Sequence, residues 1–205
     1  MAAAVVAGLA GCAGGGWTKE EKALIEGQGA VMRVLTVESA EDLAVLRAVA
    51  TELPQEAVAS ELYRALAEKM LATVTSPEQD GVGIAGPQVG ISRRIVAVQR
   101  FDKEGEPFEV YPNIRITAMR GEKEPGAEGC LSVPGRRGEV LRYRDIDISY
   151  LSPETLQTVT ERVQGFTAVI FQHECDHLDG VLLVDRMSTV QRISVRGKLK
   201  RLQGK

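Results

Sequence analysis

The sequence predicts an α+β fold made of antiparallel strands and hairpins together with two helices. One long segment has apolar residues at helical spacing, whereas several others alternate apolar and polar residues as strands do. A second helix is predicted around a five-residue pattern that contains both histidines of the chain. The chain has 205 residues, 44% of them hydrophobic, which is enough for one well-packed core.

The predicted elements follow one another without an internal repeat. Residues 32–37 are predicted as an edge strand or an extended lead-in. Residues 56–74 place Leu62, Leu66 and Met70 on one helical face and predict a single long helix that stops before Pro77. The predicted strands are residues 94–99, 109–118, 146–151 and 156–163, the last two forming a hairpin with a turn at 152–155.

The second helix is predicted over residues 167–178 and ends at Asp179-Gly180. It contains His173-Glu174-Cys175-Asp176-His177, and two imidazoles four residues apart lie about 40° apart around a helix axis. They can therefore bind one metal ion, with the Glu as general base toward a metal-bound water. The alternative is a chance match on an amphipathic helix.

A third metal ligand is expected upstream of the histidines, because catalytic metals of this kind usually have three protein ligands. After His177 the chain has no further His or Glu. Cys175 faces away from the histidines and is predicted to be a small buried residue, and Cys12 lies in a Gly/Ala-rich terminus. Cys130 remains. A structural thiol in a turn and a catalytic nucleophile are the other interpretations of Cys130, although a nucleophile would leave the H-E-x-x-H spacing without a role.

Three segments resemble, in order and spacing, the signature motifs of the peptide deformylase family. One departure occurs at Gly86, where the family usually has Ala. Glycine allows the backbone of this loop more conformations, so the loop is expected to be locally less rigid. The resemblance covers residues 30–187 and implies strands wrapped around a central helix with the H-E-x-x-H motif. The segments are Gly81-Val82-Gly83-Ile84-Ala85-Gly86-Pro87-Gln88, Glu128-Gly129-Cys130-Leu131-Ser132 and Gln172-His173-Glu174-Cys175-Asp176-His177-Leu178.

The resemblance implies a hydrolase that removes the N-formyl group from the initiator methionine of nascent polypeptides and releases formate. It also implies one divalent metal ion held by Cys130, His173 and His177. In the cell this ion is expected to be Fe(II), whereas zinc, nickel or cobalt also suit a Cys/His/His site in purified protein. Two other functions compete with this one. The first is a non-catalytic version of the fold that binds metal or docks on the ribosome, and the second is a metalloendopeptidase with a long open cleft.

The catalytic roles also follow from the resemblance. Glu174 is expected to accept a proton from water and then to protonate the leaving amine. The Leu131 backbone N–H and the Gln88 side-chain amide are expected to donate to the developing oxyanion. For Gln88, a structural hydrogen bond is the alternative. Asp176 is expected either to orient neighbouring groups or to be a solvated or capping residue.

The substrate's first side chain is expected to enter an apolar pocket beside the motif helix. Arg137 is expected near the peptide backbone of the substrate, with a solvated surface arginine as the alternative. The predicted substrate-binding residues are Gly83, Ile84, Ala85, Arg137, Ile170 and Phe171.

The two ends of the chain differ from the predicted domain. Residues 1–29 are predicted to be an apolar segment and a Gly-rich linker, disordered or signal-like. Residues 9–12, Leu-Ala-Gly-Cys, resemble a lipoprotein processing site, but the apolar stretch is too short to span a membrane and has no preceding Lys or Arg. A lipid anchor, a mis-assigned start and a disordered tail all remain open. A cytoplasmic location is favoured, because the expected substrates emerge on ribosomes.

Residues 188–205 form a basic extension with no acidic residue. Contact with the ribosome and a frayed, solvated end are both compatible with this composition. The net charge of −3 argues against specific binding of nucleic acid. Three cysteines do not suggest a disulfide framework, and the chain is expected to be a monomer.

Overall fold

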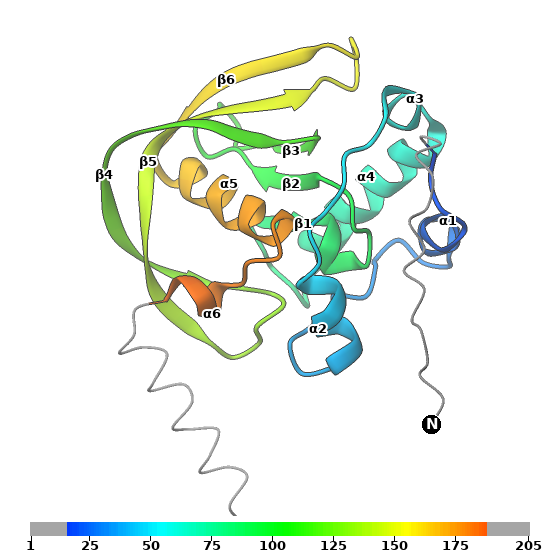
Figure 1. Cartoon of the computed structure of the whole chain (residues 1–205), viewed down its shortest axis with the longest axis horizontal. Helices are drawn as coiled ribbons and strands as arrows, with labels where there is room; N and C mark the ends of the chain where they lie inside the picture. The colour runs from blue at the N-terminus through cyan, green and yellow to red at the C-terminus, as the bar shows by residue number, and fades with distance from the viewer. Residues whose placement is uncertain (1–15, 188–205) are drawn as a thin grey trace, which may run out of the picture.

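Two antiparallel three-stranded sheets form the framework of the protein (Figure 1). The computed structural model describes residues 16–187. The first sheet has the order β1 (Gly83–Ala85), β2 (Ile95–Gln99), β3 (Phe108–Pro112), and the second has the order β4 (Arg115–Gly129), β5 (Arg137–Leu151), β6 (Thr158–Gln164). The predicted α+β class with antiparallel strands is confirmed.

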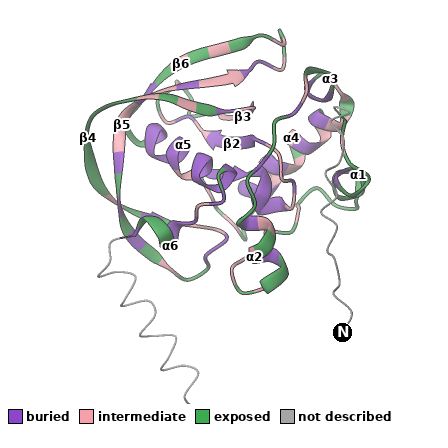
Figure 2. Ribbon diagram, viewed as in Figure 1, coloured by how far each residue is buried: buried purple, intermediate pink, exposed green. Residues whose placement is uncertain are grey.

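Helix α5 (Gly165–Leu178) contains the H-E-x-x-H pattern and contacts strands of both sheets. Figure 2 shows that α5 is buried along most of its length. A helix buried on nearly every face must have protein packed all around it, and the two sheets supply that surrounding here. The other helical elements are α1 (Lys19–Glu26), α2 (Ala40–Leu46), α3 (Gln55–Val58), α4 (Glu61–Val74), the 3-10 helix η1 (Gly86–Val89) and α6 (Leu183–Arg186).

The hydrophobic core has two main parts, one on each side of the first sheet. Leu66 and Met70 of α4 pack with Ile84 of β1 in one part. Phe171 of α5 packs with Ile146 of β5 in the other. All five side chains are fully buried, so α5 is held between the first sheet and β5 by apolar contacts on both sides.

The single helix predicted over residues 56–74 is wrong, because α3 and α4 are separate helices. The chain leaves helical geometry at Ser60, whose φ is −84° and ψ is 156°. Its side-chain oxygen accepts a hydrogen bond from the Tyr63 backbone N–H at 3.2 Å and caps α4. A serine in this position typically stabilises a helix start by about 1 kcal/mol, so the cap defines a new helix instead of continuing the old one.

The strand predicted over residues 109–118 is likewise two strands, β3 and β4. Asn113 lies between them with φ of +56°, in the left-handed region that Asn tolerates better than most residues. Its side chain accepts from the Leu53 N–H and donates to the Leu53 carbonyl oxygen, each at 2.7 Å. This turn transfers the chain from the first sheet to the second.

The predicted hairpin is present, but its strands have different bounds. β5 starts at Arg137, not at residue 146, because it pairs with β4 along almost its entire length. β6 starts at Thr158, because Leu156 has φ of +56° and belongs to the turn. The sequence prediction therefore missed the long β4–β5 ribbon, which positions much of the site.

The predicted linker is wrong at residues 19–26, which form α1. The Thr18 hydroxyl accepts from the Glu21 N–H at 3.1 Å, and the Glu21 carboxylate accepts from the Thr18 N–H at 2.8 Å. This capping box starts the helix, and the buried Ile25 packs it against the core beside α4. Glu21 also forms a salt bridge with Arg93 at 2.6 Å.

Residues 32–37 form an extended lead-in and not a strand. The Leu35 N–H donates to the Gln88 carbonyl oxygen at 2.8 Å, and the Val37 N–H donates to the Ser132 carbonyl oxygen at 2.9 Å. The lead-in thus connects the two loops that contain the first and second predicted motifs.

The predictions for Leu9 to Cys12 and for the basic extension lie outside the described residues. Within residues 16–187, no helix is long and apolar enough to cross a membrane.

Candidate metal centre and active site

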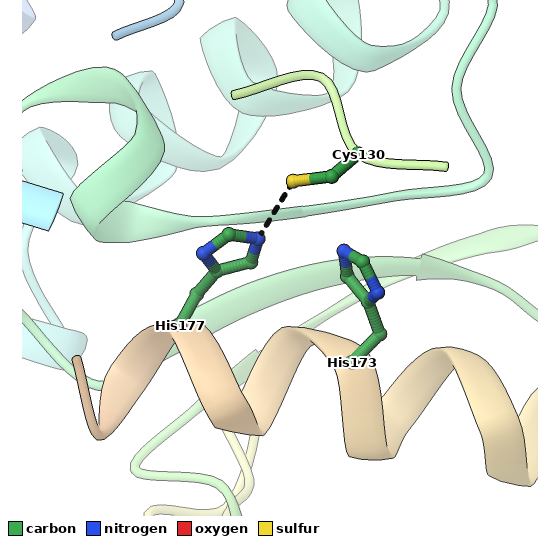
Figure 3. Close-up of side chains that lie close together, drawn as sticks. All are labelled: Cys130, His173 and His177. Atoms are coloured by element: carbon green, nitrogen blue, oxygen red, sulfur yellow. Dashed lines mark hydrogen bonds between the residues drawn. The ribbon is translucent and has the colours of Figure 1, made fainter. Parts of the chain in front are cut away.

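Cys130, His173 and His177 point toward one another from two different parts of the fold (Figure 3). Cys130 directly follows β4, and both histidines project from α5. The three donor atoms lie within 4.8 Å of one another, and Cys130 Sγ is 3.2 Å from His177 Nε2. Around a tetrahedral ion, sulfur and imidazole nitrogen ligands lie about 3.4–3.6 Å apart. The donor set predicted from the sequence therefore comes together with a spacing that fits one metal ion.

The orientation of His173 is held by a carboxylate that was not among the predicted site residues. His173 Nδ1 lies 2.9 Å from Glu128 Oε2, so its Nε2 is left for the centre. Arg142 donates to the same carboxylate from Nε at 2.8 Å and from Nη2 at 3.0 Å. Burial of Glu128 opposes its ionisation, but the hydrogen bonds from His173 and Arg142 outweigh burial and lower its pKa to about 2.

The charged network continues from Arg142 to the surface of α6. Arg142 Nη1 donates to Asp176 Oδ2 at 2.6 Å, and Arg186 Nε donates to the same oxygen at 3.0 Å. Asp176 is buried between these two arginines, which agrees with the orienting alternative and not with the solvated one. The sequence signal available for Glu128 was an acid two residues before the proposed Cys ligand. Arg142 becomes its neighbour only through the β4–β5 pairing.

Glu174 is a buried carboxyl group next to the three donors. It is 4% exposed, and its Oε2 has no hydrogen-bond partner among the described residues. Burial raises the pKa of Glu174 to about 7, although the charge of His173 acts in the opposite direction. A carboxyl group whose pKa is near neutrality can both accept and donate a proton at physiological pH, as an acid–base catalyst must.

Gly83 of β1 lies directly against this carboxylate. A Cβ at position 83 would lie 2.5 Å from Glu174 Oε1 and 2.8 Å from Ile170 Cγ2. Any side chain there would displace the carboxylate. The glycine therefore allows the first sheet to approach α5 closely at the active site.

Gln88 is held in one orientation by the loop that contains it. Its Oε1 accepts from the Ala85 N–H at 2.8 Å, and its Nε2 donates to Ser132 Oγ at 3.2 Å and lies 3.9 Å from Cys130 Sγ. The amide nitrogen of Gln88 therefore lies on the side of Cys130. Within the described chain, the Leu131 backbone N–H donates no hydrogen bond, so it is free to meet a ligand.

Gly86, the one departure from the family motifs, is also a site of close backbone approach. A Cβ at position 86 would lie 2.6 Å from the Ile91 carbonyl oxygen and 2.8 Å from that of Arg93. The space of the missing methyl group is thus taken up by the loop that follows η1. The expected loss of local rigidity is countered by this packing, since Gly86 is buried.

A cavity of about 650 Å³ opens beside the metal centre. Phe171, Ile84 and Ala85 do not line it, because their side chains are fully buried in the core, where Phe171 packs edge-on against Tyr111. The prediction that these three residues form the substrate pocket is therefore wrong for their side chains. The cavity is lined by the predicted residues Gly83, Gln88, Glu174, Cys130, Leu131, His173, Arg137 and Ile170, and also by Val82, Phe166, Val169 and Arg136, which were not predicted.

An α+β domain in which a buried carboxyl group lies beside a Cys/His/His donor set defines a metal-dependent hydrolase. Comparison with known proteins identifies the family. Residues 31–193 match the family model described as polypeptide deformylase. The peptide deformylase of Caulobacter vibrioides is 39% identical over 174 residues, which cover 84% of this chain and 96% of that protein. The chain belongs to the peptide deformylase family, whose members remove the N-formyl group from nascent polypeptides.

Solved structures agree with this assignment. A class I type b peptide deformylase from Acinetobacter baumannii is 37% identical, with a TM-score of 0.69, and the match covers 77% of this chain and 100% of that one. The Plasmodium falciparum enzyme is 30% identical, with a TM-score of 0.71, over 82% of this chain and 94% of that one. The Acinetobacter baumannii enzyme has also been solved with actinonin bound and with Met-Ala-Ser bound.

Proposed function

We propose that Cys130, His173 and His177 hold one divalent ion, which is Fe(II) in the cell. The proposal is supported by the spacing of the three donors and by the Glu128 carboxylate that orients His173. Fe(II) lies low in the affinity series for such ligands, so zinc, nickel or cobalt would replace it readily in purified protein. The ion supplies Lewis acidity, which lowers the pKa of water and polarises the formyl carbonyl group.

Glu174 is proposed to perform both proton transfers. It accepts the proton of the attacking water and then delivers it to the nitrogen of the leaving amine, so formate and a free N-terminus result. The observation on which the proposal chiefly rests is the unpartnered, buried carboxylate beside the donor set. Structural carboxylates in protein interiors are normally paired, as Glu128 is here.

Gln88 and Leu131 are proposed to stabilise the oxyanion of the tetrahedral intermediate. The support is the fixed orientation of the Gln88 amide toward Cys130 and the free Leu131 N–H. Donors aimed at developing charge are typically worth about 2.7–4 kcal/mol each in the transition state.

The substrate is proposed to lie in the cavity with its first side chain against Val169 and Ile170 and its backbone near Gly83 and Arg137. The peptide deformylase of Acinetobacter baumannii with Met-Ala-Ser bound is a precedent for a short peptide in a related site. We also infer that the enzyme acts in the cytoplasm as a monomer on chains that emerge from the ribosome. The basic residues after 187 are the proposed ribosome contact.

Release of formate from formyl-Met-Ala-Ser by iron-loaded protein under anaerobic conditions tests the function directly. Glu174→Gln should lower kcat by about 10²–10⁴-fold and keep a full equivalent of metal, because Gln retains the shape of Glu but cannot accept a proton. Wild-type protein that binds iron without turnover would favour a non-catalytic version of the fold. Cleavage of unformylated casein would favour a metalloendopeptidase.

A further inference from the structure

Helix α1 packs on the catalytic domain, although it precedes the part of the chain that matches the family. Its buried Ile25 belongs to the same apolar cluster as Val89 and Ile91 at the end of the 3-10 helix η1. Leu24 of α1 reaches the turn between these two residues, because a Cβ at Gly90 would lie 3.3 Å from Leu24 Cδ1. One side of α1 therefore contacts the segment that follows η1.

An ion pair joins α1 to the same segment. Arg93 donates to the Glu21 carboxylate from Nε at 2.6 Å and from Nη2 at 3.0 Å. The two side chains are only 14% and 10% exposed, so water and salt screen this bidentate pair little. Arg93 Nη1 also donates to the Glu52 carbonyl oxygen at 3.2 Å. One guanidinium group thus connects α1, the chain before α3 and the segment that follows η1.

The backbone of this segment packs directly against Gly86, the first residue of η1. A Cβ at Gly86 would lie 2.6 Å from the Ile91 carbonyl oxygen and 2.8 Å from that of Arg93. The Ile91 N–H also donates to the Gly86 carbonyl oxygen at 3.0 Å. Gln88 lies in the same buried four-residue turn as Gly86. Because close-packed interiors transmit small displacements, the position of residues 91–93 affects the position of Gln88.

We propose that α1 positions Gln88 for catalysis, through the Glu21–Arg93 pair and the packing of residues 91–93 against Gly86. The inference rests on the proposed function, in which the Gln88 amide donates to the oxyanion. Removal of such a donor costs about 10²–10³-fold in kcat, so displacement of a donor that is still present should cost less, about three- to tenfold. KM and metal content should stay near wild type, because the pair lies outside the cavity lining and the donor set.

The test measures kcat and KM for formate release from formyl-Met-Ala-Ser by iron-loaded, full-length protein, together with the metal content of each variant. Glu21→Gln removes the charge of the pair but keeps a side chain that can complete the capping box, so α1 should still form. It should lower kcat by about three- to tenfold and leave KM within about twofold of wild type. Glu61→Gln is the matched control, because it makes the same change in the exposed Glu61–Arg64 pair of α4 and should keep the wild-type kcat.

A double variant separates positioning of Gln88 from a general effect on the fold. If α1 acts through Gln88, Glu21→Gln should cause no further loss of kcat in a Gln88→Ala background, whereas independent effects would multiply. If Glu21→Gln does not fold, Arg93→Met and Arg93→Lys provide the same test. Lysine retains a charge that can reach Glu21, so Arg93→Lys should keep kcat closer to wild type than Arg93→Met does.

A wild-type kcat for Glu21→Gln, or an equal loss in the Gln88→Ala background, would overturn the positioning role of α1 while leaving deformylation intact. A loss of metal in parallel with kcat would overturn it as well, because α1 would then support the metal donors instead of Gln88. Full activity of Gln88→Ala would overturn the proposed role of Gln88 and the inference with it. Failure of wild-type, iron-loaded protein to release formate would overturn the proposed function itself.

Discussion

Substitution of Gly83 by alanine should slow the reaction by moving the Glu174 carboxylate. The added Cβ would lie 2.5 Å from Glu174 Oε1, 3.0 Å from its Cδ and 2.8 Å from Ile170 Cγ2. A normal carbon–oxygen contact is about 3.3 Å, so the oxygen must retreat by roughly 0.8 Å. A misplacement of about 1 Å in an active site can cost about 10²-fold in rate, which corresponds to about 2.7 kcal/mol.

The assay is the kcat of formate release from formyl-Met-Ala-Ser, measured together with the metal content of each variant. Gly83→Ala should lose about two orders of magnitude in kcat and keep its metal, because the close contacts of the new methyl group include none of the three metal donors. Gly126→Ala is the matched control in β4, where the Cβ would be 3.6 Å from Arg144 Nη2, an ordinary contact. If Gly83→Ala keeps kcat within threefold of wild type, the position of Glu174 does not set the rate. Loss of metal would mean that β1 maintains the donor set itself.

Two further substitutions test the ionic networks. Arg142→Met leaves the buried Glu128 carboxylate without its guanidinium partner, so we expect a loss of about 3–5 kcal/mol in the free energy of unfolding by urea; a loss below 1 kcal/mol would contradict this. Arg100 is 1% exposed and pairs with Asp102, whose pKa is lowered because the hydrogen bond and charge of Arg100 outweigh burial. Because the pKa of Asp102 is lower in the folded than in the unfolded protein, its ionised form stabilises the fold at pH values above its unfolded pKa, which is near 4. This stabilisation is lost as the pH falls through the folded pKa of Asp102. The Tm difference between wild type and Arg100→Met should therefore shrink from pH 7 to pH 3, and a constant difference would show that Asp102 does not depend on Arg100.

The donor set could be predicted from the sequence for two reasons. The spacing of the histidines is a local property of one helix, and the cysteine ligand was identified by elimination. His173 and His177 share a helix face by spacing alone, and Cys130 was the cysteine left once the other two were set aside. Glu128 and Arg142 could not be found in this way. Their contact spans the β4–β5 ribbon, and the N-terminal half of β5 alternates too weakly to be recognised as a strand.

Two errors had a usable signal in the sequence. Thr18 and Glu21 have the spacing of a capping box, which the surrounding glycines obscured. Phe171 precedes His173 by two residues and so lies about 200° away around the helix. The same helical spacing that places Cys175 away from the metal ligands places Phe171 in the core. It also predicts that Phe166 and Ile170 lie on the face of the helix that lines the cavity, as the structure shows.

The metal donors come from two elements that must be held in register, because α5 supplies the histidines and the end of β4 supplies Cys130. β5 connects them, since it pairs with β4 and contacts α5. The Gln172 side chain accepts from the Tyr143 N–H at 3.1 Å and donates to the Tyr143 carbonyl oxygen at 2.7 Å, so it fixes α5 against β5 one residue before His173. The pair Arg142–Asp176 bridges the same two elements one residue earlier on β5. Residues that take no part in the chemistry thus hold the thiol and the imidazoles in position, and Gln172, the first residue of the third motif, is one of them.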